Sequence, residues 1–244
     1  LAFNAYCFLE GFSLSQYSFG NYSERLAPKM FDRVVCCGQD CGNVHELNSI
    51  LKGVFVAKDL INEPNNVCTA EYFAQQATEL FKGTAAEVFV RDKQWIENER
   101  MGGLLAVNRG STLPPQFVHI VWNPKHADSQ PIVLVGKGIV FDSGGLSLKP
   151  NQYMETMKSD MSGAATVLAV MKIIADTQFP LHVEALIPLT DNRPGGNAMA
   201  LGDIITMRNG TTVEILNADA EGRLILADAL SYAGSRNPKL TIDV

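Results

Sequence analysis

Apolar and polar residues follow two rhythms along the chain, and each rhythm predicts a different element. Apolar residues at helical spacing predict helices over residues 49–61, 68–82, 162–176 and 223–233. Runs rich in β-branched and aromatic residues, bounded by Gly, Pro or polar residues, predict strands. These runs are AEVFVRD, FVHIVWN, PIVLVGKGIVF, LHVEALIPLT and LTIDV. The sequence Arg208-Asn209-Gly210 is typical of a hairpin turn between two further strands.

The alternation of helices and strands predicts an α/β fold: a three-layer αβα domain with a mixed, mostly parallel sheet. In such sheets ligands gather at the carboxyl ends of the strands. Residues 1–45 differ, because they are rich in Phe, Tyr, Ser and Cys and show little periodicity. We expect them to be the tail of a separate domain, which the helix over 49–61 connects to the α/β domain.

Length and composition restrict the classes of protein. With 244 residues, 46% of them apolar, the chain can bury a sizeable core. A net charge of −6 without a basic run disfavours nucleic acid or an anionic membrane as partner. No apolar run approaches the roughly 20 residues that span a bilayer. We therefore expect a soluble protein with a small or peptidic substrate. The start, LAFNAYCFLEGF, has neither Met nor a basic region and indicates a fragment.

Cysteine content indicates a reduced, cytoplasmic protein with free thiols, because the number of cysteines is odd and all lie in the first third of the chain. Two of them stand close to His45, as in half of a zinc clip, but the second Cys/His half of such a module is absent. The cysteines are Cys7, Cys36, Cys37, Cys41 and Cys68.

Charged side chains gather at the predicted ends of strands and starts of helices in three segments. They are Lys137, Asp142 and Lys149 after one strand, Asp160 before a helix, and Asp219, Glu221 and Arg223 in NADAEGRL. Four carboxylates that converge would repel one another unless cations neutralised them. Oxygen ligands suit Mg, Mn or Zn, and bridging carboxylates hold two ions about 3.5–4 Å apart. A lysine there could be a charged donor to an oxyanion or a neutral ligand, and both lysines fit either role.

Each segment alone also has an ordinary structural explanation, as a glycine turn, a helix cap or a solvated ion pair. Other catalytic motifs are missing. The chain has no Gly-Lys-Ser/Thr phosphate loop, no G-x-G-x-x-G after a strand, no H-E-x-x-H, and no G-x-S-x-G around Ser143. The histidines are scattered, at His45, His119, His126 and His182.

The segment NADAEGRL closely resembles the N-T-D-A-E-G-R-L signature of the leucyl aminopeptidase family, the hexameric dimetal exopeptidases of the cytosol. GKGIVFDSGGLSLKP, MKSDMSGAATVL and PGGNAMALGDIITMRNGTTVEILNADAEGRLILADAL resemble the family in order and spacing. The likeness runs from about residue 45 to the end. It implies that residues 1–44 are the remnant of an N-terminal α/β domain, 45–66 a connecting helix, and 67–244 the first part of a catalytic domain truncated at its C-terminus.

The resemblance implies a role for each residue of the cluster. One metal would be held by Lys137, Asp142, Asp160 and Glu221, and the other by Asp142, Asp219 and Glu221, so that Asp142 and Glu221 bridge. Lys137 would be a neutral-amine ligand and Lys149 a protonated group that polarises the scissile carbonyl. Arg223 would hold a bicarbonate ion that serves as general base. The residues in contact with substrate would be Lys137, Asp142, Lys149, Met157 and Asp160, with Met157 against the first side chain.

The implied reaction is removal of leucine-like, apolar N-terminal residues from short peptides. The free α-amine would bind a metal and Asp160, and a hydroxide bridging the metals would attack the first peptide carbonyl. The resemblance further implies two Mn, Zn or Mg ions, a homo-hexamer, a cytoplasmic location and a role in peptide catabolism, with no membrane and no nucleic acid as partner. Ala218 stands where the family signature has Thr, a change that removes no metal contact.

Two other functions are compatible with the residues. The first is a dimetal phosphoesterase, which uses similar carboxylate clusters, although Lys137 and the Ala-Glu-Gly-Arg context disfavour it. The second is a non-catalytic assembly or DNA-binding protein of the same fold, which the intact ligands and the acidic balance disfavour.

Overall fold

A six-stranded sheet forms the centre of the protein in a computed structural model that describes residues 2–22, 31, 34–35, 37, 42–123 and 130–244. The strands are β1 (Glu87–Arg91), β2 (Gln116–Trp122), β3 (Ile132–Val135), β4 (Gly138–Asp142), β5 (Val183–Asn192) and β8 (Leu240–Asp243). Their order is β1-β2-β5-β3-β8, with β4 also paired to β5. Because β2 is antiparallel to both neighbours and the other pairs are parallel, the predicted mixed, mostly parallel sheet is confirmed.

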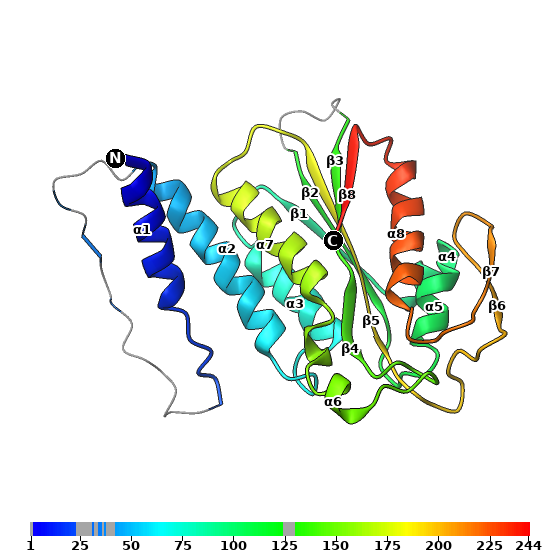
Figure 1. The fold of residues 1–244 in the computed structure, drawn as a ribbon. Coiled ribbons are helices and arrows are strands. Elements are labelled where there is room, and N and C mark those ends of the chain that lie inside the picture. The colour runs from blue at the N-terminus through cyan, green and yellow to red at the C-terminus, as the bar shows by residue number, and fades with distance from the viewer. Residues whose placement is uncertain (1, 23–30, 32–33, 36, 38–41, 124–129) are drawn as a thin grey trace.

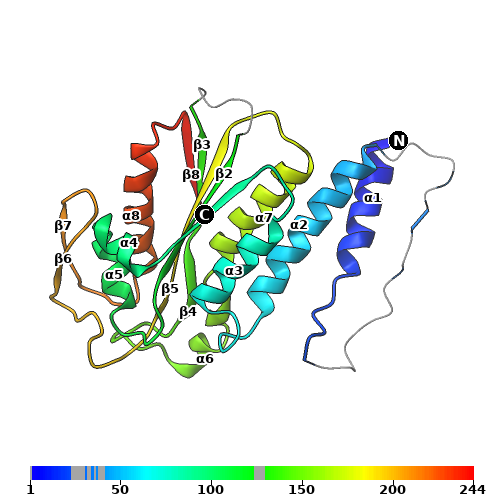
Figure 2. The same ribbon diagram turned by 180° about the vertical axis from the view of Figure 1, so that it is seen from behind.

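Helices cover both faces of the sheet, which confirms the predicted three layers (Figures 1 and 2). On one face lie α2 (Val44–Asn62), α3 (Ala70–Leu80) and α7 (Ser162–Asp176). On the other lie α4 (Lys93–Asn98), α5 (Gly102–Asn108), α8 (Gly222–Ser235) and the hairpin of β6 (Ile204–Thr206) and β7 (Thr212–Glu214). Each face has its own apolar core, and α1 (Ala2–Ser15) lies against the outer side of α2 (Figure 1).

Strand β5 is the axis of the sheet, and all ten of its residues are buried. Both β3 and β4 pair with it in succession, so the run PIVLVGKGIVF forms two strands separated by Gly136 and Lys137. A Cβ atom on Gly138 would lie 2.3 Å from the carbonyl oxygen of Pro188, so only glycine allows β4 to approach β5 this closely. The pairing sets Asp142 beside Asn192 where the two strands end.

Local signals explain where the main helices begin. The side chains of Asn43, Thr69 and Asp92 accept hydrogen bonds from backbone N–H groups in the first turns of α2, α3 and α4, each three residues on. Helix α2 packs tightly on α7, since Gly53 leaves no space for a side chain: a Cβ atom there would lie 2.6 Å from Ile173 Cγ1. The predicted connecting helix is therefore part of the helical layer.

All the helices and strands that we predicted are present, and the Asn209-Gly210 hairpin has Gly210 at a φ of 86°. The sequence did not predict α1, because its apolar residues show no clear helical period. It also did not predict α4, α5, α6 (Asn151–Met154) or the 3-10 helix η2 (Met157–Ser159), which are too short to show a period.

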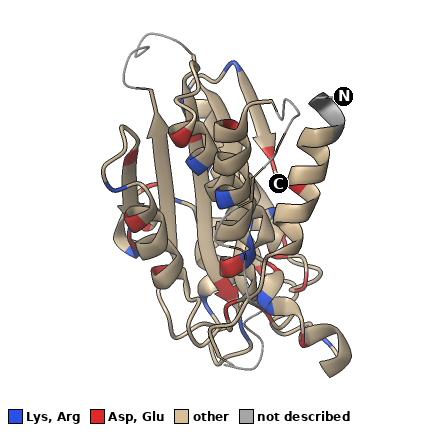
Figure 3. Cartoon of the chain, turned by 90° about the vertical axis from the view of Figure 1, so that its left-hand side faces the viewer, with Lys and Arg blue, Asp and Glu red and all other residues tan. Residues whose placement is uncertain are grey.

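The structure describes three of the five cysteines and most of the charged residues. Cys7, Cys37 and Cys68 are free, and burial raises the pKa of the Cys68 thiol to about 12. Cys36, Cys41 and His126 lie outside the described residues. In the view of Figure 3, basic and acidic positions are interspersed and form no continuous basic strip. Within the described part of the chain, no helix has the length and apolar character needed to cross a bilayer.

Candidate active site

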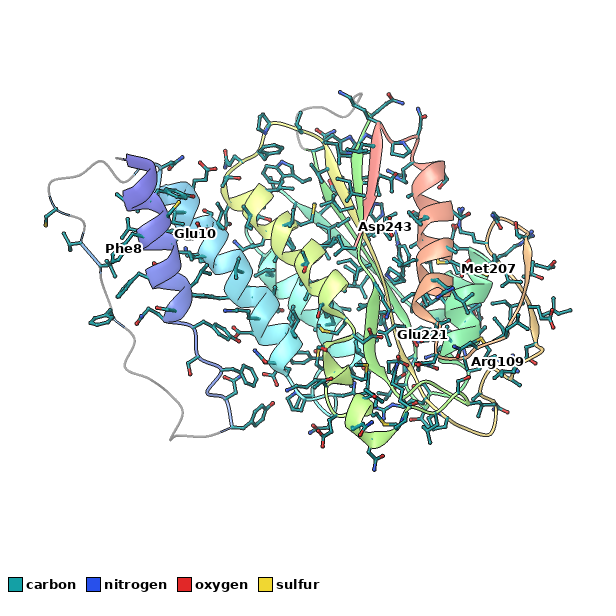
Figure 4. All side chains as sticks on the ribbon, viewed as in Figure 1. Phe8, Glu10, Arg109, Met207, Glu221 and Asp243 are labelled. Atoms are coloured by element: carbon teal, nitrogen blue, oxygen red, sulfur yellow. The ribbon has the colours of Figure 1, made fainter. Side chains whose placement is uncertain are left out.

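The three charged segments meet at the carboxyl ends of β4 and β5, beside the first turn of α8. Asp142 ends β4, Asp160 follows η2, and Asp219 and Glu221 lie in the loop that leads into α8. Figure 4 shows Glu221 at the start of α8, next to the end of the sheet. Oxygen atoms of Asp142, Asp219 and Glu221 all lie within 4.8 Å of one another. The sequence-predicted convergence is thus present.

Asp142 is buried, and both of its oxygens have partners. Its Oδ1 accepts hydrogen bonds from the Gly144 N–H at 2.8 Å and from Asn192 Nδ2 at 2.9 Å. Its Oδ2 lies 2.9 Å from Lys149 Nζ. Burial alone would raise the pKa of this carboxyl, but the bonds from Lys149, Gly144 and Asn192 outweigh burial and lower it. Asp142 is therefore held as a carboxylate.

Lys149 lies between two carboxylates from different segments. Its Nζ is 2.5 Å from Asp219 Oδ1 and 2.9 Å from Asp142 Oδ2. Burial would lower the pKa of the ammonium, but the bonds to Asp219 and Asp142 outweigh burial and raise the pKa. Lys149 thus carries its proton at neutral pH, as a charged hydrogen-bond donor must.

Lys137 makes a second set of ion pairs on the other side of the cluster. Its Nζ lies 2.7 Å from both oxygens of Asp160 and 3.3 Å from Glu221 Oε1. Burial acts to lower the pKa of Lys137, and the contacts with Asp160 and Glu221 raise it overall. Gly222 touches the stem of this side chain, because a Cβ atom there would lie 2.2 Å from Lys137 Cε.

Asp160 and Glu221 have raised pKa values, chiefly because burial disfavours their charged forms. The nearby charge of Asp142 raises both further, while Lys137 acts in the opposite direction on both. A cation beside these two carboxyls would favour their charged forms.

Two predicted site residues stand outside these ion pairs. Arg223 is exposed on the first turn of α8, and its side chain makes no hydrogen bond or ion pair with any residue that the structure describes. Met157 is half-buried at the start of η2, three residues before Asp160. Arg223 lies in α8, directly after the loop of Glu221, and Met157 lies in η2, which ends directly before Asp160.

The Gly144-Gly145 pair shapes the loop between Asp142 and Lys149. The φ angles of the two glycines are 84° and 61°, a region that side chains rarely adopt. A Cβ atom on Gly144 would also lie 2.4 Å from the carbonyl oxygen of Ser147. The pair therefore lets the loop turn back sharply enough for Lys149 to return to Asp142.

Sequence reasoning missed one residue of the cluster, Asn192. It ends β5, it is buried, and its side chain contacts Asp142. Its signal was the polar triplet Thr190-Asp191-Asn192 at the end of an apolar strand, where an α/β sheet places ligand groups.

The donor set suits divalent cations. Clustered carboxylate oxygens are hard ligands of the kind that Mg, Mn and Zn accept, and the ammonium groups of Lys137 and Lys149 neutralise the same oxygens in this structure. An acidic cluster that could hold metal is therefore present at the predicted position.

Comparisons with known proteins identify the family of the chain. The sequence model of the Cytosol aminopeptidase family, catalytic domain, matches residues 55–244. A probable cytosol aminopeptidase of Chlorobaculum tepidum is 49% identical over 226 residues, which are 89% of this chain and 44% of that protein. One from Azoarcus sp. (strain BH72) is 48% identical over 196 residues, which are 80% of this chain and 39% of that protein.

Solved structures show the same fold. The cytosol aminopeptidase of Coxiella burnetii has a TM-score of 0.88 at 33% identity, covering 96% of this chain and 50% of that one. The bottromycin maturation enzyme BotP in complex with Mn has a TM-score of 0.85 at 35% identity, covering 95% and 49%. The chain thus spans about half the length of these proteins or less. The sequence match over residues 55–244 and the shared fold show that the chain belongs to the cytosol aminopeptidase family.

Proposed function

We propose that this protein is a metal-dependent aminopeptidase that releases leucine-like, apolar N-terminal residues from short peptides. The observation that carries the proposal is the alternation of carboxylates and lysines at the ends of β4 and β5, in a chain of this family. A phosphoesterase has no comparable support.

The proposed metal ligands fall into the two sets that the family resemblance implies. They are Lys137, Asp142, Asp160 and Glu221 for one ion, and Asp142, Asp219 and Glu221 for the other. The ions, whether Mn, Zn or Mg, would supply Lewis-acid polarisation and an activated water molecule. Lys137 would give up its proton to become a ligand, and its raised pKa in this structure means that cation binding and proton release are coupled.

Substrate recognition would use both ends of the cluster. The carboxylate of Asp160 would accept a hydrogen bond from the free α-amine of the peptide, which an internal amide cannot replace. Lys149, protonated, would donate to the carbonyl oxygen as negative charge develops on it. Met157, three residues from Asp160, would contact the first side chain. These contacts would also involve Lys137 and Asp142 as neighbours of the bound peptide.

Arg223 is proposed to hold bicarbonate as the general base. Its guanidinium is exposed beside Glu221 and has no partner among the described residues, so it is free to bind an anion there. We further propose the homo-hexamer, the cytoplasmic location and the domain division at residues 1–44, 45–66 and 67–244 that the resemblance implies.

The test compares hydrolysis of leucyl-anilide, N-acetyl-leucyl-anilide and p-nitrophenyl phosphate by the protein as it is naturally produced. Each is measured before and after chelation, and with Mn, Zn or Mg restored. We expect metal-dependent cleavage of leucyl-anilide alone, because only that substrate offers a free α-amine. Equal cleavage of the acetylated substrate would overturn the role of Asp160. Cleavage of the phosphate ester alone, or no cleavage by folded, metal-loaded protein, would overturn the proposed activity.

A further inference from the structure

Asn192 is a neutral side chain that touches three parts of the charged cluster. It is 3% exposed at the end of β5. Its Nδ2 lies 2.9 Å from Asp142 Oδ1, 3.0 Å from the Ala218 carbonyl oxygen and 3.4 Å from Glu221 Oε2. One amide group therefore joins the end of β4 to the loop that carries Asp219 and Glu221.

This amide selects which oxygen of Asp142 faces the cations. Because Asp142 Oδ1 already accepts from Asn192 Nδ2 and the Gly144 N–H, Oδ2 is the oxygen left for Lys149. Lys149 can move, since its stem is long and flexible, whereas the Asn192 amide stands on a fully buried strand. Oδ1 of Asp142 is therefore held by two groups other than a lysine.

Residues 143 and 145, in the loop after β4, also contact Asn192. The backbone carbonyl of Asn192 accepts hydrogen bonds from Ser143 Oγ at 2.7 Å and from the Ser143 N–H at 3.1 Å. Gly145, with φ at 61°, leaves room for the side chain, because a Cβ atom there would lie 2.7 Å from Asn192 Oδ1. The second glycine of the Gly-Gly pair therefore makes space for Asn192 as well as turning the loop.

We infer that Asn192 is a positioning residue that orients Asp142 and the loop of Glu221 for cation binding, an inference that rests on the proposed function. A neutral donor suits this role, because it stabilises the carboxylates by hydrogen bonds without adding a positive charge that would repel the cations. The same amide donates to Ala218 O, so a change at Asn192 alters the spacing of both segments.

Asn108 provides a matched comparison for a purely structural amide. It is also buried, and its Nδ2 donates to the Leu113 carbonyl at 2.9 Å and to Thr190 Oγ1 at 3.0 Å. Thr190 lies on β5, two residues from Asn192, yet Asn108 contacts no carboxylate among the described residues. Loss of either amide removes two good hydrogen bonds from the same region of the fold.

The experiment measures Mn²⁺ affinity by competition with a chromophoric chelator, together with the melting temperature of the metal-free protein. The variants are Asn192→Ala, Asn192→Leu, which keeps most of the side-chain volume, and Asn108→Ala, all in the protein as it is naturally produced. We expect both Asn192 variants to bind Mn²⁺ about 10–100-fold more weakly, the usual effect of losing a group that orients a ligand. Asn108→Ala should lower the melting temperature and leave the affinity unchanged.

The outcomes separate this inference from the proposed function. Unchanged Mn²⁺ affinity in either folded Asn192 variant, with normal binding by the parent protein, would overturn the positioning role alone. An equal loss of affinity in Asn108→Ala would also overturn it, because the effect would then be one of general stability. Absence of binding of Mn²⁺, Zn²⁺ and Mg²⁺ alike in the folded parent protein would overturn both proposals.

Discussion

Gly222 and Lys137 are packed so closely that no side chain fits between them: a Cβ atom on Gly222 would lie 2.2 Å from Lys137 Cε and 2.9 Å from its Nζ. The contact joins the first residue of α8 to the residue between β3 and β4. A steric reason therefore explains the glycine in Ala-Glu-Gly-Arg: without a side chain there, the ammonium group of Lys137 can reach Asp160 and Glu221.

Gly222→Ala should reduce function and also the stability of the metal-free protein. The new methyl group would push the flexible end of Lys137 away from Asp160 and Glu221, so these carboxylates would lose their cation, at a cost of about 1–3 kcal/mol. We expect Mn²⁺ affinity and leucyl-anilide hydrolysis to fall at least about 10-fold, together with a lower melting temperature of the metal-free protein.

Gly234→Ala is the matched control for this substitution. It also lies in α8, and nothing stands within 4 Å of its ideal Cβ position. The control should leave Lys137 in place, so its metal binding should be normal and its melting temperature should not fall. Normal metal binding by Gly222→Ala would contradict the proposed role of Lys137.

Lys149→Met should cost both stability and activity. The substitution leaves Asp142 and Asp219 without the cation that now lies between them, a loss of about 1–3 kcal/mol in the metal-free protein. Because bound metal ions would supply positive charge to the same carboxylates, the loss should shrink when Mn²⁺ is added. Hydrolysis of leucyl-anilide should fall at least about 100-fold, as when an oxyanion donor is removed. Urea unfolding with and without Mn²⁺ and steady-state kinetics measure these effects.

Lys172→Met is the control for removal of a partly buried lysine. The side chain of Lys172 is 18% exposed, against 16% for Lys149, and it pairs with Asp176 one turn along α7. Its loss should change the free energy of unfolding by less than about 0.5 kcal/mol. If Lys149→Met changed the free energy of unfolding and the rate of leucyl-anilide hydrolysis no more than this control does, the proposed role of Lys149 as a donor to the substrate carbonyl would be wrong.

The sequence predicts the fold well where an element has a long apolar pattern. Strand β5 and helices α2 and α7 are examples, because burial on one or both faces leaves a readable period. Helix α1 could not be predicted, since its apolar residues are spread around the helix rather than along one stripe. The pairing of β3 and β4 with one strand also could not be predicted, because it depends on a contact between Gly138 and Pro188 that is distant in sequence.

In the candidate site, too, some features could be predicted from the sequence and others could not. The charged members could be predicted, because three charged segments stand together at the predicted ends of strands and starts of helices and their motifs resemble those of a known family. The way they pair could not: Lys149 with Asp142 and Asp219, and Lys137 with Asp160 and Glu221, follow from the three-dimensional path of the loops. Asn192 carries no charge, so the polar triplet Thr190-Asp191-Asn192 at the end of β5 is its only signal in the sequence.

Gly53→Leu should destabilise the packing of α2 on α7. A Cβ atom at this position already meets Ile173 Cγ1 at 2.6 Å and the Ala169 carbonyl oxygen at 3.1 Å, so a larger side chain must separate the helices. Overpacking of this kind costs about 1–3 kcal/mol. Gly11→Leu in α1 is the control, because nothing lies within 4 Å of its ideal Cβ. Urea unfolding of both variants gives the comparison, and equal stabilities would show that α2 is only loosely attached to the domain.

Glu184 should control part of the acid sensitivity of the fold. It is 1% exposed near the start of β5, and its carboxylate lies 2.8 Å from His119 Nε2, 2.9 Å from Arg236 Nε and 3.2 Å from His182 Nε2. Burial alone would raise the pKa of Glu184, but the bonds from His119 and Arg236 lower it from the ordinary 4.5 to about 2. The native protein therefore holds this group ionised at a pH where the unfolded chain has already bound a proton.

The sign of the effect follows from this difference. The stability that the Glu184 carboxylate contributes is fully present above about pH 4.5 and is lost as the pH falls toward about 2. Glu184→Gln cannot bind that proton, so it should be less stable than the parent at about pH 5 and approach the parent's stability as the pH falls. Urea unfolding at a series of pH values measures the gap, which is the difference in free energy of unfolding between the parent and Glu184→Gln.

The control is Glu214→Gln, on exposed β7, which should have the same free energy of unfolding as the parent at every pH. A gap for Glu184→Gln that stayed constant down to about pH 2 would mean that the network of Glu184 with His119 and Arg236 does not hold the carboxylate ionised.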